Sequence, residues 1–352
     1  MSTLRKDLCQ VKNYSSYLAD YWQAHLADKL SFAPTVISTF AGAGGSSLGY
    51  SIAGYRELLA VEWDENAVET FKLNFHGVPV YHGDIAKLSV SECLKLAGIK
   101  AGELDVFDGS PPCQGFSTSG KRMIDDPRNQ LFREYIRLLR GIQPKVFVME
   151  NVSGMIKGKM KLIFSEIMRE LKASGYNVSA RLLNAKWFGV PQSRERIIFI
   201  GVRSDLNIQP SHPLPTHDLI TVRQAISDCN KEDDVFAKPM KGEVAEMMRL
   251  CLPGKSLAQT FKTSKYFNWV KADWDKPVMT IPKSTTYSGF TIWHPEEDRC
   301  LTGVELKRLG GWPDEFKFIG SYINWVNRIG NSVPPPFMRA VAAYVKEKIL
   351  KK

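Results

Sequence analysis

The chain has 352 residues, of which 44% are hydrophobic and 24% are charged, an ordinary globular composition. A chain of this length can bury a full core and form more than one domain. The formal net charge is +10, and this excess favours a polyanionic partner such as nucleic acid. The six cysteines are scattered, without the two-residue gap of a zinc site or a redox dithiol, so we expect no bound metal.

Nothing in the sequence indicates a membrane protein. No apolar stretch is long enough to span a bilayer. Residues 1–12 are charged and lack the apolar core of a signal peptide. We therefore expect a cytoplasmic protein with reduced thiols.

Strand-like and helical patterns alternate along the first two thirds of the chain. Residues 1–33 are polar with clustered aromatics and predict a helical N-terminal extension. Strand-like apolar runs follow at residues 35–40, 57–63, 79–84, 106–107, 145–152, 176–182 and 196–202, with helical patterns between several of them, including 46–53, 65–75 and 132–140. This alternation predicts an α/β fold, a doubly wound and mostly parallel sheet.

The rhythm changes near residue 204. Residues 205–296 are rich in proline, mixed in charge and poor in periodicity, which indicates a smaller, irregular domain. Regular patterning returns at residues 301–309, and a helical pattern covers 336–349. We therefore predict three parts: 1–204, with the N-terminal extension and the sheet, 205–296, and 297–352, which returns to the sheet domain.

A glycine-rich loop, FAGAGGSSLGY (residues 40–50), directly follows the first predicted strand. Glycines at this place let the backbone approach a ligand closely. Glu62 ends the next strand and Asp84 the third, where carboxylates can accept hydrogen bonds from ribose hydroxyls. These features predict a nucleoside-bearing cofactor. Ser47 replaces the third glycine of the dinucleotide fingerprint, and a plain helix-opening turn with incidental acids is the alternative.

Cys113 lies in DVFDGSPPCQGFS (residues 105–117), after a short strand and two stiffening prolines. A cysteine at the carboxyl end of a parallel strand is placed where such sheets bind ligands, and it can act as a nucleophile. A small buried thiol is the alternative, because free cysteine is among the most buried residue types.

Two further motifs carry charge at strand ends. Glu150 in ENV closes an apolar strand and suits a proton donor or a hydrogen-bond anchor, unless it is simply exposed. In QSRER, Arg194 and Arg196 alternate about Glu195, so on one strand they would share a face. Two guanidinium groups aimed at one site can hold phosphates or a carbonyl oxygen, whereas a solvated charge run is the plain alternative.

The order of these motifs resembles that of the cytosine-C5 DNA methyltransferases of bacteria and phages. The resemblance runs from residue 35 to residue 345 and comprises FAGAGG, Glu62, GD at 83–84, PPCQGFS, ENV, QSRER, LTGVELKRLGGWPD at 301–314 and GNSVPP at 330–335. Gly310 and Trp312 depart from the family's usual glutamine and phenylalanine. Any single motif can arise by chance, but eight in the family's order should not.

The resemblance implies a Rossmann-like methyltransferase fold in which residues 205–296 are the target-recognition domain. It implies transfer of a methyl group from S-adenosylmethionine to C5 of a flipped cytosine in a specific double-stranded DNA sequence, leaving S-adenosylhomocysteine. Cys113 would add to C6 of the ring. Glu150 would hydrogen-bond N3 and the exocyclic amine, Arg196 would hold O2, and Arg194 would support the cysteine loop or a phosphate.

The resemblance also assigns binding residues. The cofactor would contact Phe40, Gly42, Ala43, Gly44, Gly45, Glu62, Trp63, Asp84, Ile85, Pro112, Leu131, Asn331, Ser332 and Val333. DNA would contact Ser117, Ser119, Lys121 and Arg122. We further expect a monomer and a cognate restriction endonuclease that acts separately.

Three alternatives stay open at this point. A tRNA cytosine-C5 methyltransferase shares the plan but carries a Cys-Phe-Thr signature, and the nearest string here is TFKT at residues 260–263. A nicotinamide-dependent dehydrogenase shares the sheet but has no use for PPCQ and ENV. A non-catalytic DNA-binding relative would be expected to have lost Cys113 or Glu150.

Overall fold

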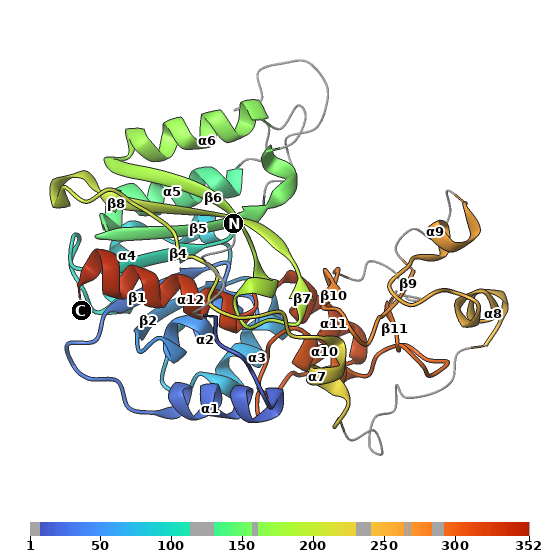
Figure 1. Cartoon of the computed structure of the whole chain (residues 1–352). Helices are drawn as coiled ribbons and strands as arrows, with labels where there is room; N and C mark the ends of the chain where they lie inside the picture. The colour runs from blue at the N-terminus through green and yellow to red at the C-terminus, as the bar shows by residue number, and fades with distance from the viewer. Residues whose placement is uncertain are drawn as a thin grey trace. The chain divides into compact units, whose positions relative to one another are not determined.

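The protein is described by a computed structural model that covers residues 8–112, 130–156, 161–229, 241–263, 266, 269–283 and 292–351 (Figure 1). The chain forms two compact units. The sheet unit consists of Ala24–Leu183, Glu195–Leu214 and Met338–Lys352. The irregular unit consists of Met1–Gln23, Asn184–Arg194 and Pro215–Phe337. The boundaries expected at residues 204 and 296 stay a prediction.

The sheet unit is built on a seven-stranded sheet in the order β3-β2-β1-β4-β5-β8-β6. Its strands are β1 (Thr35–Thr39), β2 (Arg56–Glu62), β3 (Val80–His82), β4 (Val106–Gly109), β5 (Val146–Val152), β6 (Tyr176–Asn184) and β8 (Glu195–Arg203). From β3 to β5 all neighbouring strands pair in parallel, whereas β8 pairs with β5 in antiparallel fashion. The predicted α/β fold with a mostly parallel sheet is confirmed.

Helices cover both faces of this sheet. They are α2 (Gly45–Ile52), α3 (Glu65–Asn74), α4 (Val90–Ala97), α5 (Gln130–Ile142), α6 (Lys161–Ala173) and α12 (Pro335–Tyr344), with shorter turns η1 (Ile85–Lys87), η4 (Ser153–Ile156), η7 (Ser204–Leu206) and η8 (Val345–Leu350). The short turn η6 (Ala185–Trp187) belongs to the irregular unit. Phe147 and Met149 of β5 pack with α4, α5 and α6 in one core cluster. Val146 and Val148 point to the opposite face, because side chains alternate along a strand, and they are fully buried.

A group of buried polar side chains lies between α2 and the sheet. Tyr50 of α2 donates a hydrogen bond to the Asp108 carboxylate at 3.2 Å. Both carboxylate oxygens of Glu57 and the hydroxyls of Ser38 and Ser47 are buried. Burial raises the pKa of Glu57 from 4.5 to about 7, and burial together with the Glu57 charge raises the pKa of Asp108. The fold therefore holds carboxyl groups whose ionisation opposes folding.

Replacing Glu57 with glutamine should remove the destabilisation that arises because the Glu57 carboxyl ionises less readily in the folded protein than in the unfolded chain. Because the folded pKa is raised, the unfolded chain ionises first as pH rises, and wild-type stability is lost between about pH 4.3 and pH 7. At pH 8 the Glu57→Gln variant should be more stable by about 3 kcal/mol, from about 1.36 kcal/mol per pKa unit. Urea unfolding at pH 4 and pH 8 measures this. An equal difference at both pH values would contradict it.

The irregular unit contains small elements. They are α7 (Val222–Ile226), α8 (Glu243–Arg249), α9 (Leu257–Phe261), α10 (Gly303–Leu309), α11 (Tyr322–Asn331), β7 (Gln192–Ser193), β9 (Val270–Lys271), β10 (Val278–Met279) and β11 (Ile292–Trp293). β7 pairs with β10 and β9 with β11, both in parallel. A small core of Ala245, Met248, Cys251, Leu257 and Trp293 lies under α8 and α9.

The N-terminal extension forms helix α1 (Tyr14–Leu26), as its sequence predicts. Within the irregular unit, the buried Tyr14 donates its hydroxyl hydrogen to the Gly189 carbonyl at 3.3 Å. Tyr17 lies 3.2 Å from His217 Nε2, and the Cys9 N–H donates to the Thr216 carbonyl at 3.0 Å. The extension is therefore packed against residues far along the chain, which its own sequence could not indicate.

The two departures from the family motif are accommodated by local packing. Trp312 is fully buried, and its ring centroid lies 4.4 Å from that of Phe316 and 5.1 Å from that of Phe318. Gly310 follows α10, where an added Cβ would lie 2.9 Å from both Ile329 and Trp312. The large indole of Trp312 thus lies next to Gly310, where a side chain would be crowded.

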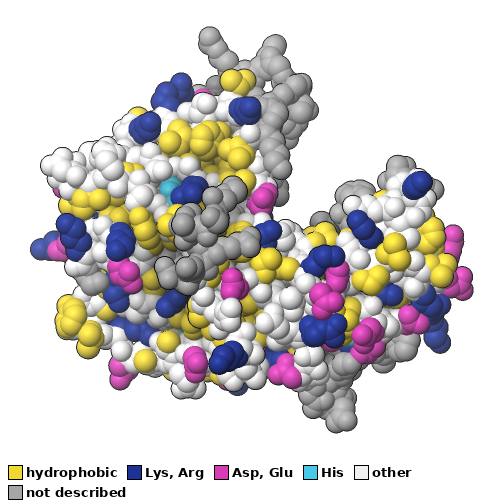
Figure 2. Space-filling view, viewed as in Figure 1, with side chains coloured by type: hydrophobic (Ala, Val, Ile, Leu, Met, Phe, Trp, Pro, Cys, Tyr) yellow, Lys and Arg dark blue, Asp and Glu magenta, His cyan; other side chains and the backbone are white. Residues whose placement is uncertain are grey.

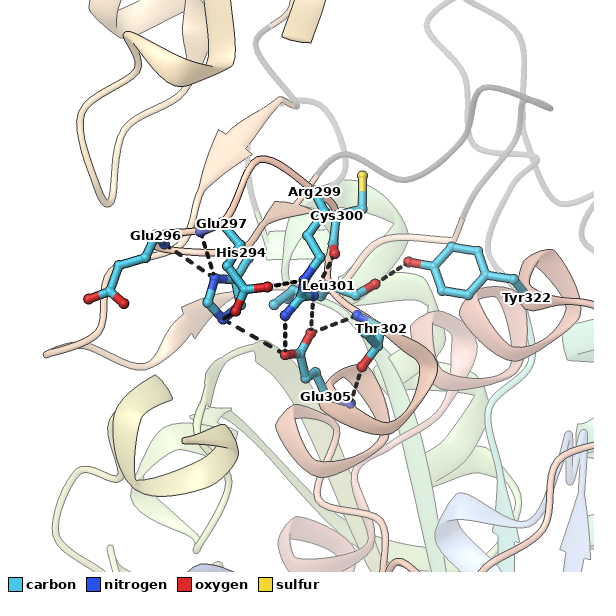
Figure 3. A network of polar contacts seen from close by, with 9 residues as sticks. All are labelled: His294, Glu296, Glu297, Arg299, Cys300, Leu301, Thr302, Glu305 and Tyr322. Atoms are coloured by element: carbon cyan, nitrogen blue, oxygen red, sulfur yellow. Dashed lines mark hydrogen bonds and ion pairs between the residues drawn. The ribbon is translucent and has the colours of Figure 1, made fainter. Parts of the chain in front are cut away.

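A buried ion pair anchors the start of α10. Arg299 donates two hydrogen bonds to the carboxylate of Glu305, both at 2.8 Å, and neither side chain is more than 3% exposed. The Thr302 N–H donates to the same carboxylate at 2.7 Å. Figure 3 shows His294, Arg299 and Thr302 converging on Glu305. Burial alone would raise the pKa of Glu305, but the hydrogen bonds from Arg299 and Thr302 hold it below its usual value.

Replacing Glu305 with glutamine should strongly destabilise the irregular unit, because it leaves the Arg299 charge buried with a poorer partner. Breaking a buried pair in this way costs about 3–5 kcal/mol. Since the folded pKa is lowered, the contribution is present above about pH 4.3 and is lost as pH falls through the folded pKa. Hydrogen exchange of residues 292–309 measures this. Unchanged protection near pH 7 would contradict it.

Candidate active site

The glycine-rich loop leaves β1 in a strained backbone conformation. Phe40 has a φ of 55°, which is unusual for a bulky residue. Gly42 and Gly44 also have positive φ values of 57° and 97°. At Gly44 an added Cβ would run into the ring of Phe75, so the close packing of α2 on α3 requires a glycine there.

Glu62 fixes this loop through its carboxylate. One oxygen accepts a hydrogen bond from the Gly42 N–H at 2.8 Å. The other accepts from the N–H groups of Trp63 and Asp64, both at 2.9 Å. A carboxylate offers about four lone-pair positions, so roughly one is left for a ligand hydroxyl. Glu62 therefore joins the ends of β1 and β2 and faces the adjoining cavity.

That cavity has a volume of about 290 Å³ and opens beside the carboxyl ends of β1, β2 and β3. It is lined by Phe40, Val61, Glu62, Trp63, Gly83, Asp84, Ile85, Pro112 and Leu131. Trp63 is 76% exposed, which leaves its ring free to stack on a ligand. Apolar walls, an exposed aromatic ring and a strand-end carboxylate fit a nucleoside with ribose hydroxyls.

Seven of the residues expected to bind the cofactor line this cavity: Phe40, Glu62, Trp63, Asp84, Ile85, Pro112 and Leu131. Gly42, Ala43, Gly44 and Gly45 do not line it; they form the turn into α2. The sequence prediction did not include Val61 and Gly83. Both directly precede a predicted acid, and Gly83 was part of the GD motif, so proximity to that motif was the available signal. Ligand binding itself stays a prediction.

The predicted residues Asn331, Ser332 and Val333 belong to the irregular unit. Asn331 is the last residue of α11, and the Ser332 hydroxyl donates to the Arg328 carbonyl at 2.6 Å. Val333 is 4% exposed. Their expected contact with the cofactor stays a prediction.

Glu150 and Arg196 are brought together by the pairing of β5 with β8. In the antiparallel register Glu150 faces Ile198, and Val152 faces Arg196. Diagonal neighbours two residues apart lie on the same face and are within reach of long side chains. The Arg196 Nε atom lies 2.6 Å from Glu150 Oε1, and both side chains are largely buried. The pair can present a carboxylate and a guanidinium group to one planar ligand.

Asn151 ties the motif of Glu150 to the motif that carries the cysteine. Its amide donates to the Pro111 carbonyl at 3.1 Å, and its side-chain oxygen accepts from the Val152 N–H at 2.9 Å. Pro112 is the last described residue before Cys113. Cys113 and the expected DNA contacts Ser117, Ser119, Lys121 and Arg122 lie outside the described residues.

Three of the remaining cysteines do not resemble nucleophiles. Burial raises the pKa of Cys93 to about 11 and the pKa of Cys229 and of Cys300 to about 12. These three are thiols at neutral pH, and a thiol is a far weaker nucleophile than a thiolate. Cys251 is buried within the small core of the irregular unit, and Cys9 lies at the surface.

The expectation that Arg194 and Arg196 share the face of one strand is wrong. Arg194 lies in neither β7 nor β8, because its N–H donates back to the Gln192 carbonyl at 3.1 Å. Arg194 is 2% exposed, and its guanidinium group donates to the carbonyls of Ile281 and Gly330 at 3.2 and 2.8 Å. The turn at Arg194 breaks the alternation that a continuous strand would have given.

The positive charge of the chain is not concentrated in one patch on the face shown in Figure 2. Lys and Arg side chains are interspersed with Asp and Glu there. Among the residues that the structure describes, no helix is long and apolar enough to cross a membrane. Within the same ranges no three His, Cys, Asp or Glu side chains could hold a metal ion, and metal-free chemistry stays a prediction.

Replacing Glu62 with alanine should loosen the glycine loop, because the N–H groups of Gly42, Trp63 and Asp64 lose their acceptor. Their amide hydrogens should exchange faster. Affinity for S-adenosylhomocysteine should fall at least about tenfold, as expected when one hydrogen bond to a charged group is lost. Calorimetry and hydrogen exchange measure the two effects. Unchanged affinity with a loosened loop would remove Glu62 from the binding site.

Two named methyltransferases are similar to this chain over most of its length. The chain is 35% identical over 328 residues to the Type II methyltransferase M1.HphI of Haemophilus parahaemolyticus, covering 88% of this chain and 86% of that protein. It is 32% identical over 366 residues to M.XorII of Xanthomonas oryzae pv. oryzae, covering 91% and 86%.

Solved structures of methyltransferases share the fold of this chain. A prophage-encoded E. coli protein described as a DNA modification methyltransferase superimposes with a TM-score of 0.75 at 25% identity, over 91% of this chain and all of that one. The S. pombe Dnmt2 methyltransferase gives 0.63 at 18% identity, over 90% and 98% of the two chains, which shows the fold alone. The model of the C-5 cytosine-specific DNA methylases matches residues 34–347. The chain therefore belongs to the C-5 cytosine-specific DNA methylase family.

Proposed function

We propose that this protein transfers a methyl group from S-adenosylmethionine to C5 of a flipped cytosine in a specific double-stranded DNA sequence, through a covalent adduct of Cys113. The observation that carries the proposal is the buried Glu150–Arg196 pair, which adjoins the PPC motif through the Asn151–Pro111 hydrogen bond. The family and its curated Type II relatives support it.

The chemistry addresses the weak nucleophilicity of C5. The Cys113 thiolate adds to C6, and the electron pair of the C5–C6 double bond becomes available at C5. When the base binds, Glu150 would take up a proton from water, donate it to N3 and accept from the exocyclic amine, while Arg196 would donate to O2. The negative charge that the thiolate brings into the ring is thereby neutralised, and the proton leaves N3 again when the thiolate leaves. Their ion pair holds the two groups in place before the base arrives.

S-adenosylmethionine supplies an electrophilic methyl group on a sulfonium centre. Glu62, which also accepts the Gly42 N–H, would accept from a ribose hydroxyl, and the exposed Trp63 would pack against the nucleoside. Asp84 accepts the Ala86 N–H at 3.0 Å and so places Ile85 on the cavity wall. After transfer to C5, a water takes the C5 proton, the double bond forms again and the thiolate leaves.

The DNA side of the proposal rests on the family resemblance and on charge. C6 cannot be reached inside a stacked duplex, so the target base must leave the helix. Ser117 and Ser119 would contact the DNA near the vacated position, and Lys121 and Arg122 would meet phosphates. Residues 205–296 would read the target sequence.

The biological setting belongs to the same proposal, and the relatives named Type II methyltransferases support a restriction–modification role. The protein would act as a monomer in the cytoplasm, associated with the nucleoid when on DNA. A cognate restriction endonuclease would act separately at the same sequence.

Methyl transfer to nucleic acid tests the proposal directly. Label from S-adenosylmethionine should enter duplex DNA, and bisulfite sequencing of DNA from an expressing host should reveal one protected cytosine context. Label that enters only tRNA would favour the rival tRNA methyltransferase. Binding of duplex DNA without any label transfer would favour a non-catalytic relative.

Replacing Cys113 with serine should abolish turnover, because a hydroxyl is not ionised at neutral pH and cannot add to C6. Loss of covalent catalysis should lower kcat by at least about a thousandfold, in the range found for removed nucleophiles. Cys9→Ser, a change at an exposed cysteine, is the matched control and should keep full activity. A Cys113→Ser variant with wild-type kcat would reject the nucleophile assignment.

A further inference from the structure

The turn at residues 192–194 makes many contacts within the irregular unit. The two-residue pairing of β7 with β10 is too short to be stable alone. The Val278 N–H donates to the Pro191 carbonyl at 2.9 Å, and the Thr280 hydroxyl donates to the Ser193 carbonyl at 2.8 Å. Residues 278–280 are therefore held on the turn by side-chain as well as backbone hydrogen bonds.

The side chains of Gln192 and Arg194 hydrogen-bond to the two backbone groups of Ile281, the next residue of the same segment. The Ile281 N–H donates to Gln192 Oε1 at 3.1 Å, and the Ile281 carbonyl accepts from Arg194 at 3.2 Å. Gln192 is 1% exposed and Arg194 is 2% exposed, so these bonds are shielded from water. A register slip of one residue in this segment would break both bonds and leave buried polar groups without partners.

Arg194 also reaches the end of α11. Its second nitrogen donates to the Gly330 carbonyl at 2.8 Å. Gly330 packs directly on the backbone of the segment, since an added Cβ would lie 2.8 Å from the Lys283 nitrogen and would overlap Pro282. Gln192 Nε2 donates to the Leu309 carbonyl of α10 at 3.2 Å. Three segments of the irregular unit, residues 278–283, α10 and α11, thus meet at this turn.

We propose that Arg194 is a positioning residue that fixes residues 278–283 of the target-recognition region in register with the QSRER motif and with α11. The two arginines of the motif then have separate roles. Arg196 pairs with Glu150 in the sheet unit, and Arg194 orders residues 278–283 in the irregular unit. This inference rests on the proposed function, because it assigns DNA recognition to residues 205–296.

The kinetic test separates positioning from catalysis. In Arg194→Met the KM for cognate duplex should rise at least about tenfold, roughly the equivalent of one lost hydrogen bond to a charged group. The value of kcat at saturating DNA should fall less than about threefold. Arg194→Lys, which keeps the charge, should restore part of the affinity. Arg169→Met is the matched control, because Arg169 is 65% exposed on α6, and it should behave as wild type.

Local hydrogen exchange gives a second readout. Exchange at Val278 and Ile281 should accelerate in Arg194→Met, while the amides of β1 and β4 keep their protection. Gly330→Ala attacks the same junction from the other side. Alanine ordinarily stabilises a helix, so faster exchange in residues 278–283 would come from the collision with Pro282 and Lys283.

The outcomes are distinguishable. A large fall in kcat for Arg194→Met with an unchanged KM for DNA would overturn the inference and make Arg194 a catalytic residue. Unchanged kinetics and unchanged exchange would overturn it as well. Failure of the wild-type protein to methylate any duplex would reject the proposed function instead, and the exchange measurement would still test the junction.

Discussion

The antiparallel pairing of β5 with β8 is the constraint on which the candidate active site depends. The other pairings from β3 to β5 are parallel, and they gather the carboxyl ends of those strands at one edge. β8 runs the opposite way, so its first residues lie beside the last residues of β5. A basic residue that opens one strand therefore meets an acidic residue near the end of the other, as Arg196 meets Glu150 at 2.6 Å.

The carboxyl groups of this fold differ in role and in the stability of their charged form, according to the groups that surround them. Glu62 accepts three backbone N–H groups and holds the glycine loop open to the cavity. Glu305 is paired with Arg299, and its charge is stabilised although it is fully buried. Glu57 and Asp108 are buried near one another, and their charged forms are disfavoured. The ionisation of Glu57 and Asp108 thus opposes folding of the sheet unit, whereas the Glu305–Arg299 pair anchors the start of α10.

Much of the sheet could be predicted because its strands are short apolar runs bounded by glycine, proline or acids, and such patterns are local. The positions of Glu62 and Asp84 were also predictable: Glu62 ends β2, Asp84 follows two residues after β3, and both line one cavity. The break at Arg194 was not predicted, because QSRERIIFI carries no glycine or proline to mark it. The side-chain bonds that hold Arg194 in the turn reach Ile281 and Gly330, 87 and 136 residues away. The partners of α1 were hidden for the same reason, since Gly189 lies 175 residues from Tyr14.

The central claim is that Cys113 adds to a cytosine positioned by Glu150 and Arg196. The most direct measurement uses a duplex with 5-fluorocytosine at the methylated position, where the fluorine cannot leave as a proton does and the adduct persists. With S-adenosylmethionine present, we predict a denaturation-resistant protein–DNA complex in which mass spectrometry finds the modified base on the peptide containing Cys113. A duplex that is methylated normally but gives no such complex, or a complex through another residue, would contradict the account.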